Sequence, residues 1–245
     1  MTAISIRRPL LALVLAVCVA LLGALAASAH AGQGTVFASL SNLRTDTSWA
    51  YPTTDAVIRR SPSARAAAVG RLRFLTVDDQ AELYEALRSA KLASKVWVQI
   101  EVPGRPNGRS GWVPRAALSA FSVSHEYLRV DQERLRATLY KDGKAIFSAP
   151  VGVGKASTVT PKGHFYVLEK LVSVNAPVYG PFALGTSAYA PTLSEWPGGG
   201  VVGIHGTNEP QLIPGRPSHG CVRMRDQDIA KLFSLIGLGT PIDIV

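Results

Sequence analysis

The sequence has little cysteine, and the positions of its two cysteines restrict their chemistry. Cys18 lies in the apolar run from Leu11 to Ala27, which follows a basic start and precedes an A-x-A site ending at Ala31. This pattern predicts a secretory signal peptide over residues 1–31. Its removal discards Cys18, so the exported chain cannot form an internal disulfide, which favours a reactive role for Cys221.

The same N-terminal residues are compatible with two other kinds of segment. An uncleaved membrane anchor is one alternative, because the apolar run is near the lower length that spans a bilayer. A lipoprotein start at Cys18 is weakly supported, since Val17 stands where a small residue is expected and the cysteine lies inside the apolar run. The sequence favours export, with the mature protein at the cell wall, in the periplasm or at another extracytoplasmic surface.

The chain also lacks the patterns of nucleic-acid binding proteins. It has no block of lysine and arginine, no zinc-finger spacing and no motif that interleaves aromatic with basic residues. Its formal net charge of +9 falls to +7 when Arg7 and Arg8 leave with the signal. A basic exported protein favours anionic surroundings such as cell-wall polymers, although an ordinary basic, soluble surface explains the same charge.

The segment from Val201 to Met224 carries the strongest sign of chemistry. His205 follows the apolar run 201–204, which reads as the end of a buried strand, and twelve residues then separate it from Ser218. That loop is rich in proline and glycine, so it can return the chain and bring Cys221 to face His205. A glycine before the cysteine and a helical pattern after it predict a thiolate with a lowered pKa.

These residues, H-G-T-N at 205–208 and S-H-G-C-V-R-M at 218–224, resemble the signature of the YkuD-type L,D-transpeptidase catalytic domain. The runs P-V-G-V-G from Pro150 and T-P-x-G-x-F from Thr160 resemble the same family. The resemblance covers about half of the chain. It implies a mainly β fold over residues 121–245, a β-sandwich with one C-terminal helix.

The resemblance implies roles for five residues. Cys221 would be the nucleophile that accepts the acyl group, and His205 its base. The backbone carbonyl of Gly206 would orient the imidazole, while His219 and the amides of Gly220 and Cys221 would line the oxyanion site.

Three further residues are candidate substrate contacts. Ser218 is expected to donate a hydrogen bond beside the thiol. Arg223 stands where family members often carry asparagine, and it would bind a substrate carboxylate unless it is only a surface charge. Tyr179 lies in a stretch, 175–200, that reads as a long loop and so as a substrate wall, although its aromatic residues can equally be ordinary packing.

The same side chains are compatible with two other roles. Cys221 could be a small buried hydrophobe, or it could join His205 and His219 as a zinc ligand, but no fourth donor is suggested nearby. No metal and no cofactor are therefore predicted. His125 and His164 read as structural residues.

The N-terminal half predicts a smaller domain. Residues 32–50 lack clear periodicity and read as a flexible leader. Residues 51–118 hold short apolar runs separated by turn signals, and the run at 81–92 favours a strand over a helix. A W-V-x-I strand, a glycine-rich hairpin and a G-W-V-P strand resemble a bacterial SH3-like domain, which implies a small β-barrel.

The C-terminal stretch predicts two more elements. Asp226 is expected to cap a helix in which Ile229, Leu232, Phe233 and Ile236 recur with helical spacing and which Gly237 ends. A last strand, 241–245, would close the sheet.

Taken together, the sequence predicts an exported, two-domain, mainly β enzyme that transfers acyl groups through a cysteine thioester. The resemblance implies a peptidoglycan stem tetrapeptide as donor, cut at its L-to-D bond, and a second stem amine as acceptor. With water as acceptor the enzyme would be an L,D-carboxypeptidase. A non-catalytic cell-wall-binding protein is the alternative from another class, and loss of His205 or Cys221 would be its mark.

Overall fold

The computed structural model describes residues 35–172, 177–193 and 197–245. The predicted signal peptide, residues 1–31, and Trp196 lie outside this part. Within the described part, no helix has the length and apolar character needed to cross a lipid bilayer.

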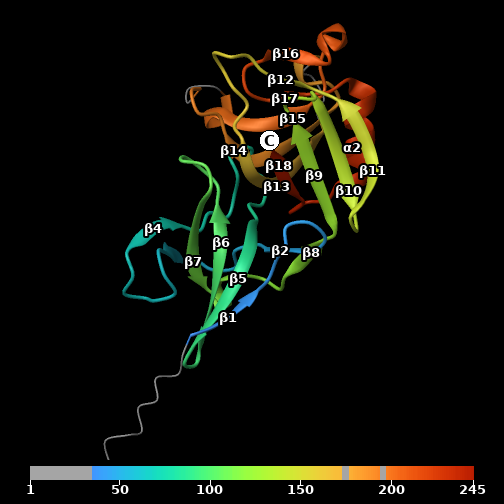
Figure 1. Ribbon diagram of the computed structural model, residues 1–245. Helices are drawn as coiled ribbons and strands as arrows, with labels where there is room; N and C mark the ends of the chain where they lie inside the picture. Colours follow the sequence, from blue (N-terminus) through green and yellow to red (C-terminus); the bar gives the residue numbers. More distant parts are fainter. Residues whose placement is uncertain (1–34, 173–176, 194–196) are drawn as a thin grey trace, which may run out of the picture. The chain divides into compact units, whose positions relative to one another are not determined.

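The described residues form two β-sheets and one α-helix (Figure 1). The first sheet contains β1 (Val36–Ser39), β2 (Thr47–Ala50), β3 (Val57–Arg59), β4 (Ala68–Arg71), β5 (Tyr84–Leu92), β6 (Lys95–Val102), β7 (Arg109–Pro114) and β8 (Ser122–Ser124). The second contains β9 (Glu126–Asp131), β10 (Arg136–Lys141), β11 (Lys144–Pro150), β12 (Gly152–Gly154), β13 (Gly163–Val172), β14 (Phe182–Tyr189), β15 (Val201–His205), β16 (Gly215–Ser218), β17 (Val222–Arg223) and β18 (Pro241–Ile244). The helix is α2 (Asp226–Leu235), and single 3-10 turns are η1 (Arg115–Ala117), η2 (Pro177–Tyr179), η3 (Pro197–Gly200) and η4 (Pro210–Leu212). The prediction of a mainly β fold with one C-terminal helix is confirmed.

The first sheet has the order β4-β3-β7-β6-β5-β2-β8. β1 pairs with residues 88–91 of β5, beyond the part of β5 that pairs with β2. The strand predicted within 81–92 is β5, and the predicted hairpin joins the antiparallel strands β6 and β7. These strands cover most of the range assigned to an SH3-like barrel. That likeness stays a prediction.

The expectation of an unstructured leader over 32–50 is wrong where the structure describes it. β1 and β2 both lie in this range and pair with β5. β1 is exposed along its whole length, so it shows no apolar alternation and obtains its order from backbone pairing. In β2 the buried residues include Thr47 and Ser48, and the Ser48 hydroxyl donates to the carbonyl of Leu40 at 2.7 Å.

The second sheet has the order β11-β10-β9-β18-β13-β14-β15-β17-β12-β16. The predicted turn between β10 and β11 is formed by Asp142 and Gly143, both with positive φ, as a two-residue hairpin requires. The predicted last strand, β18, does not close an edge. It lies inside the sheet, parallel to β9 and antiparallel to β13.

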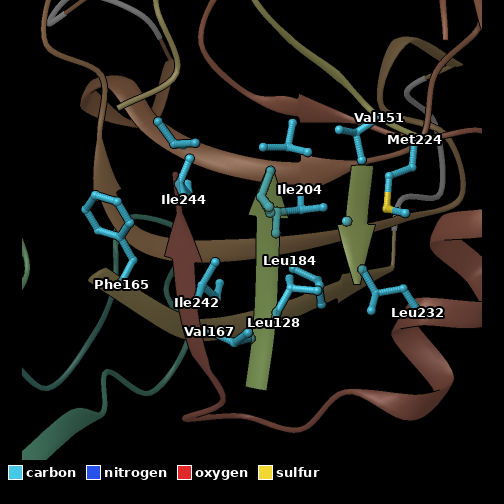
Figure 2. Close-up of a cluster of buried hydrophobic side chains, with 14 of the residues drawn as sticks. Leu128, Val151, Phe165, Val167, Leu184, Ile204, Met224, Leu232, Ile242 and Ile244 are labelled. Atoms are coloured by element: carbon cyan, nitrogen blue, oxygen red, sulfur yellow. The ribbon is translucent and has the colours of Figure 1, made fainter. Parts of the chain in front are cut away.

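The core of the second sheet explains why these strands and α2 belong together. Buried aliphatic side chains from nine of its ten strands meet those from the helix, and Figure 2 shows part of this cluster. Ile229 and Leu232 are the helix residues buried in this cluster, and α2 packs on β14 and β15. Met224, three residues after the cysteine, belongs to the same buried cluster as Leu232, and both are labelled in Figure 2. Full burial of one large aliphatic side chain stabilises a fold by about 1.5–3 kcal/mol.

Two expectations for this part are corrected. The stretch 175–200 is not one loop, because β14 lies inside it and is buried in the sheet. Its small residues gave no strand signal, and Gly185 is required by the close approach of the Glu169 side chain. The second correction concerns Asp226, which is the first residue of α2 rather than its cap. Arg225 holds the cap position and makes no side-chain capping bond.

Candidate active site

The thiol of Cys221 is positioned by two parallel strands. β15 pairs with β17 in a register that places Ile204 opposite Val222, so Gly203 stands opposite Cys221. The N–H of Gly203 donates to the Cys221 Sγ at 3.4 Å. His205 follows on the same face of β15, two residues from Gly203. The strand pairing therefore brings the thiol and the imidazole to one place, as the sequence predicts.

Both side chains line a narrow pocket of about 50 Å³. Its other lining residues are Val178, Tyr179, Ala190, Leu193, Gly200, Val201, Val202, Ser218, His219, Gly220 and Arg223. A wider cavity of about 640 Å³ shares His219 and Arg223 with this pocket and is lined also by Lys155, Glu209 and Arg216. The nucleophile candidate thus lies where two hollows share part of their walls.

The imidazole of His205 is held in one orientation. Its Nδ1 lies 2.7 Å from the carbonyl oxygen of Gly206, an acceptor that requires the proton on Nδ1. The lone pair is then on Nε2. Burial lowers the pKa of His205 to about 4, with a further contribution from the charge of Arg223, and the Gly206 bond opposes this only in part. The ring is therefore neutral at neutral pH and can accept a proton at Nε2.

The thiol differs from the thiolate that the sequence predicts. Burial raises the pKa of Cys221, while the Gly203 N–H and the Arg223 charge oppose the rise without cancelling it. The predicted support from a helix N-terminus is missing, because β17 follows the cysteine and α2 begins only at Asp226. The resting pair is a neutral thiol beside a neutral imidazole.

The turn from Ser218 to Cys221 is tied by its own backbone. The buried Ser218 hydroxyl donates to the Cys221 carbonyl at 2.6 Å and accepts from the Gly220 N–H at 3.1 Å. Gly220 has φ +127°, which favours glycine at this position. Ser218 therefore shapes the turn instead of presenting its hydroxyl to a substrate, and the Gly220 amide is engaged, contrary to its predicted place in the oxyanion site. His219 is exposed and lines both hollows.

The backbone just after His205 is packed too closely for any side chain. A Cβ at Gly206 would collide with the Asp226 carboxylate and would lie 2.8 Å from the Gly180 Cα. The same carboxylate accepts from the Thr207 N–H at 2.9 Å. Asp226 thus holds the segment whose carbonyl orients His205. Sequence reasoning missed this role, because nothing local distinguishes this aspartate from a helix cap.

Tyr179 covers the base. Its ring meets the His205 ring edge to face, with the centroids 4.9 Å apart at an interplanar angle of 71°. This contact comes from η2, at one end of the stretch predicted as a wall. The other end, near Leu193 and Gly200, also lines the pocket, so the wall prediction agrees with the structure at its ends.

Arg223 is largely buried and bound to another side chain. Its Nη1 lies 2.9 Å from Glu209 Oε2, with 13% of the arginine side chain exposed against 47% of the glutamate. The guanidinium is therefore not a simple surface charge, and Glu209 occupies one of its donors in the resting state. The structure places the other predicted histidines, His125 and His164, outside this site: His125 bonds to Thr45 and His164 to Asp243 and Glu85.

Comparison with known proteins agrees with this geometry. The family model of the L,D-transpeptidase catalytic domain, YkuD, matches residues 125–244. The putative L,D-transpeptidase YkuD of Bacillus subtilis is 36% identical over 107 residues, which cover 44% of this chain and 58% of that protein. Its counterpart in Bacillus licheniformis is 35% identical over 106 residues, 43% of this chain and 57% of that protein. The putative L,D-transpeptidase YqjB of Bacillus subtilis is 30% identical over 122 residues, 46% of this chain and 68% of that protein. The chain thus spans somewhat over half the length of the two YkuD proteins.

Proposed function

Because the chain belongs to the L,D-transpeptidase family with a YkuD catalytic domain, we propose that it transfers an acyl group between peptidoglycan stem peptides through a thioester on Cys221. The donor is a stem tetrapeptide, attacked at the carbonyl that precedes its terminal D-amino acid. The acceptor is the amine of a second stem.

One observation carries the proposal. The Nδ1 of His205 is bound to the Gly206 carbonyl, which leaves Nε2 unprotonated on a side chain that lines the pocket together with Cys221. A nucleophile, a base and a group that orients the base are the three parts of nucleophilic acyl transfer. The neutral state of both partners fits a thiol that loses its proton as it attacks, instead of a preformed thiolate.

The proposed steps balance with these side chains alone. Sγ attacks the donor carbonyl while Nε2 of His205 takes the thiol proton, and a tetrahedral oxyanion forms. The carbon–nitrogen bond then breaks, and the leaving D-amino acid takes that proton on its nitrogen. The acceptor amine attacks the thioester, again giving its proton to His205, and the thiol is regenerated when the imidazolium returns it.

The oxyanion needs hydrogen-bond donors near the nucleophile. Since the Gly220 N–H already donates to the Ser218 hydroxyl, the Cys221 amide and His219 are the proposed donors to the oxyanion. Two substrates also need two approaches to one sulfur. The narrow pocket and the wider cavity, which share His219 and Arg223, are compatible with that need.

We also propose the setting of this reaction. Residues 1–31 direct export, and the basic chain acts at a cell-wall polymer surface, where the stem peptides are found. Residues 51–118 form an SH3-like module that contributes to wall binding. The run of antiparallel strands from β3 to β7 supports this reading.

Intact-mass measurement after incubation with a synthetic stem tetrapeptide tests the proposal. We expect a covalent adduct of the donor less its terminal D-amino acid, which disappears, with cross-linked product, when an acceptor amine is added. Release of free tripeptide at the same rate with and without the amine would instead assign L,D-carboxypeptidase activity. The Cys221→Ser variant is the matched control, and an adduct of equal yield in this variant would exclude Cys221 as the nucleophile.

A further inference from the structure

The hairpin between β6 and β7 reaches the segment that lines the catalytic pocket. This hairpin, residues 103–108, belongs to the first sheet, yet Arg105 and Asn107 bind backbone groups of residues 189–193 and 199–200, the described ends of the segment between β14 and β15. Three residues of these ends line the pocket with Cys221: Ala190, Leu193 and Gly200.

Arg105 satisfies three carbonyls of this segment with one side chain. Its Nε and Nη2 donate to the Ala190 carbonyl at 3.0 and 2.9 Å, and Nη2 donates also to that of Leu193 at 3.0 Å. Its Nη1 donates to the carbonyl of Gly199 at 2.8 Å. Only a planar guanidinium offers several donors at fixed angles, so lysine cannot reproduce this set.

Asn107 extends the ladder of β14 by one residue. Its Nδ2 donates to the Tyr189 carbonyl at 2.8 Å, and its Oδ1 accepts from the Tyr189 N–H at 2.9 Å. The side-chain amide thus makes both bonds that a neighbouring strand residue would make. Arg105 adds a cation–π contact, with its guanidinium carbon 5.1 Å from the Tyr189 ring centroid.

The segment held in this way lies against the catalytic turn. A Cβ built at Gly220 would lie 3.7 Å from the Ala190 Cβ, so Ala190 is one van der Waals contact away from the residue before the nucleophile. Gly200 is packed against the arginine, because a Cβ at this position would collide with both the Leu193 carbonyl and the Arg105 guanidinium. Displacement of the segment would therefore change the shape of the pocket next to the sulfur.

We infer that Arg105 and Asn107 are positioning residues for the acyl-transfer site: the first sheet, through its β6–β7 hairpin, holds the pocket wall formed by Ala190, Leu193 and Gly200 in place for the donor peptide. Neither residue touches the reacting atoms. The inference rests on the proposed function only for the identity of the donor. The hydrogen bonds and the position of the wall do not depend on it.

The test compares Arg105→Ala and Arg105→Lys with wild type and with Arg59→Ala. Arg59 is a matched control, since it lies in the same sheet and donates to a backbone carbonyl, that of Ala66 at 3.0 Å, away from the catalytic pocket. Three quantities are measured for each protein: kcat and KM with the stem tetrapeptide, the rate at which iodoacetamide alkylates Cys221 without substrate, and the unfolding temperature.

We expect both Arg105 variants to raise KM by about tenfold or more, because small displacements of a binding wall weaken binding strongly. The kcat should change much less, and alkylation should become faster as the wall loosens. Unfolding temperatures should match that of Arg59→Ala. If only the charge of Arg105 mattered, Arg105→Lys would keep the wild-type KM. If the role were merely structural, the unfolding temperature and the active fraction would fall while KM stayed unchanged. Either result would overturn the inference.

The alkylation arm separates this inference from the proposed function. If wild type does not convert the stem peptide but Arg105→Ala still alkylates faster than wild type and Arg59→Ala, the substrate assignment fails and the positioning role stands. If wild type converts the peptide and neither KM nor alkylation changes in Arg105→Ala, the positioning role is wrong and the proposed function stands. Asn107→Asp keeps the acceptor but sets a carboxylate against the Tyr189 carbonyl. If the positioning role is right, its alkylation rate should rise as in Arg105→Ala. If the positioning role is wrong, its alkylation rate should equal that of wild type.

Discussion

Two histidines of the second sheet show that burial alone does not decide the charge of an imidazole. His205, in the candidate catalytic pocket, has its pKa lowered to about 4 by burial, and it is hydrogen-bonded to the backbone carbonyl of Gly206. His164, on β13, also loses contact with water, which on its own lowers a histidine pKa. Its hydrogen bonds to the carboxylates of Asp243 and Glu85 outweigh this loss and raise its pKa to about 10. The first is a neutral base and the second a fixed cation.

The carboxylates around His164 come from both sheets. Its Nδ1 lies 2.9 Å from Asp243 on β18, while its Nε2 lies 3.1 Å from Glu85 on β5 and 3.9 Å from Glu101 on β6. Burial, followed by the charge of Glu85, raises the pKa of Glu101 to about 8, so this carboxyl is protonated at neutral pH. The cluster thus balances its charges where the first sheet meets β13 and β18. The proposed catalytic pair, His205 and Cys221, in contrast carries no charge to balance.

The largest effect that separates the two histidines is catalytic. His205→Gln should reduce kcat by about 10²–10⁴-fold, since a general base contributes on this scale, and should leave the unfolding temperature close to that of wild type. Turnover of the stem tetrapeptide by purified, folded protein measures it. His164→Gln is the control and should keep its activity per folded molecule. Equal losses of activity in the two variants would contradict the distinction.

The second effect is on stability. His164→Gln should lower the free energy of unfolding by up to about 3–5 kcal/mol, because removing one partner leaves buried carboxylates without their cation. Unfolding in denaturant measures the change. The double variant His164→Gln, Glu85→Gln removes the stranded charge of Glu85 as well and should be more stable than the single variant. If the single and double variants are equally stable, the ion pair is not what His164 contributes.

The pH dependence of stability should show opposite signs for the two residues. The folded pKa of His164 lies above its ordinary value of 6.5, so its stabilisation is complete below pH 6.5 and is lost as the pH rises towards 10. The folded pKa of His205 lies below 6.5, so its contribution is complete above pH 6.5 and is lost as the pH falls towards 4. Unfolding free energies measured from pH 4 to 10 should therefore decline less on the alkaline side in His164→Gln and less on the acid side in His205→Gln.

Asp243 limits the same curve at still lower pH. Burial would raise its pKa, but the hydrogen bonds from His164 and Arg44 lower it to about 2 from 3.8. Its stabilisation is therefore present above pH 3.8 and is lost as the pH falls towards 2.

The alkaline side of the curve tests His164. If the unfolding free energy declines identically in wild type and His164→Gln as the pH rises, the assignment of His164 as the cation is contradicted.

The smallest expected effect concerns the charge near the catalytic pair. Arg223 lowers the pKa of both Cys221 and His205 through its charge. The alkylation rate of wild-type Cys221 should inflect above the value of an ordinary thiol, about 8.5. Arg223→Gln should move the inflection further up, while Arg223→Lys, which keeps the charge, should leave it near wild type. An inflection below that of an ordinary thiol would restore the thiolate that the sequence suggests.

The sequence allowed the local features of the fold to be predicted. The Asp142–Gly143 turn was predictable because two adjacent positions with positive φ select these residues, and His205 and Cys221 because their motif follows a strand. β14 was not predictable, since Gly185 and the small residues Ala183, Ser187 and Ala188 dilute the strand preference of the others. What makes them a strand is burial between β13 and β15, together with the Glu169 side chain that fills the space beside Gly185.

The electrostatic state of the site was not predictable for a similar reason. The predicted thiolate depended on a helix N-terminus next to Cys221, and sequence periodicity did not reveal that the two residues of β17 come between them. Likewise, the Gly220 amide is available in the motif but is bound by Ser218 in the folded turn. Such facts depend on which atoms become partners, and residue types alone do not determine the partners.

The position of β18 has a consequence for how the second sheet assembles. Among the strands that the structure describes, residues 241–244 are the only link in the strand order between β9, β10 and β11 on one side and β13, β14 and β15 on the other. During synthesis, the earlier strands can therefore pair only as two separate sheets until this segment has left the ribosome. The two parts of the sheet would then be joined in a single late step that pairs residues more than 100 positions apart, Leu128 with Ile242 among them. Contacts of such long range make folding slow, so this last strand sets the pace at which the whole second sheet is completed.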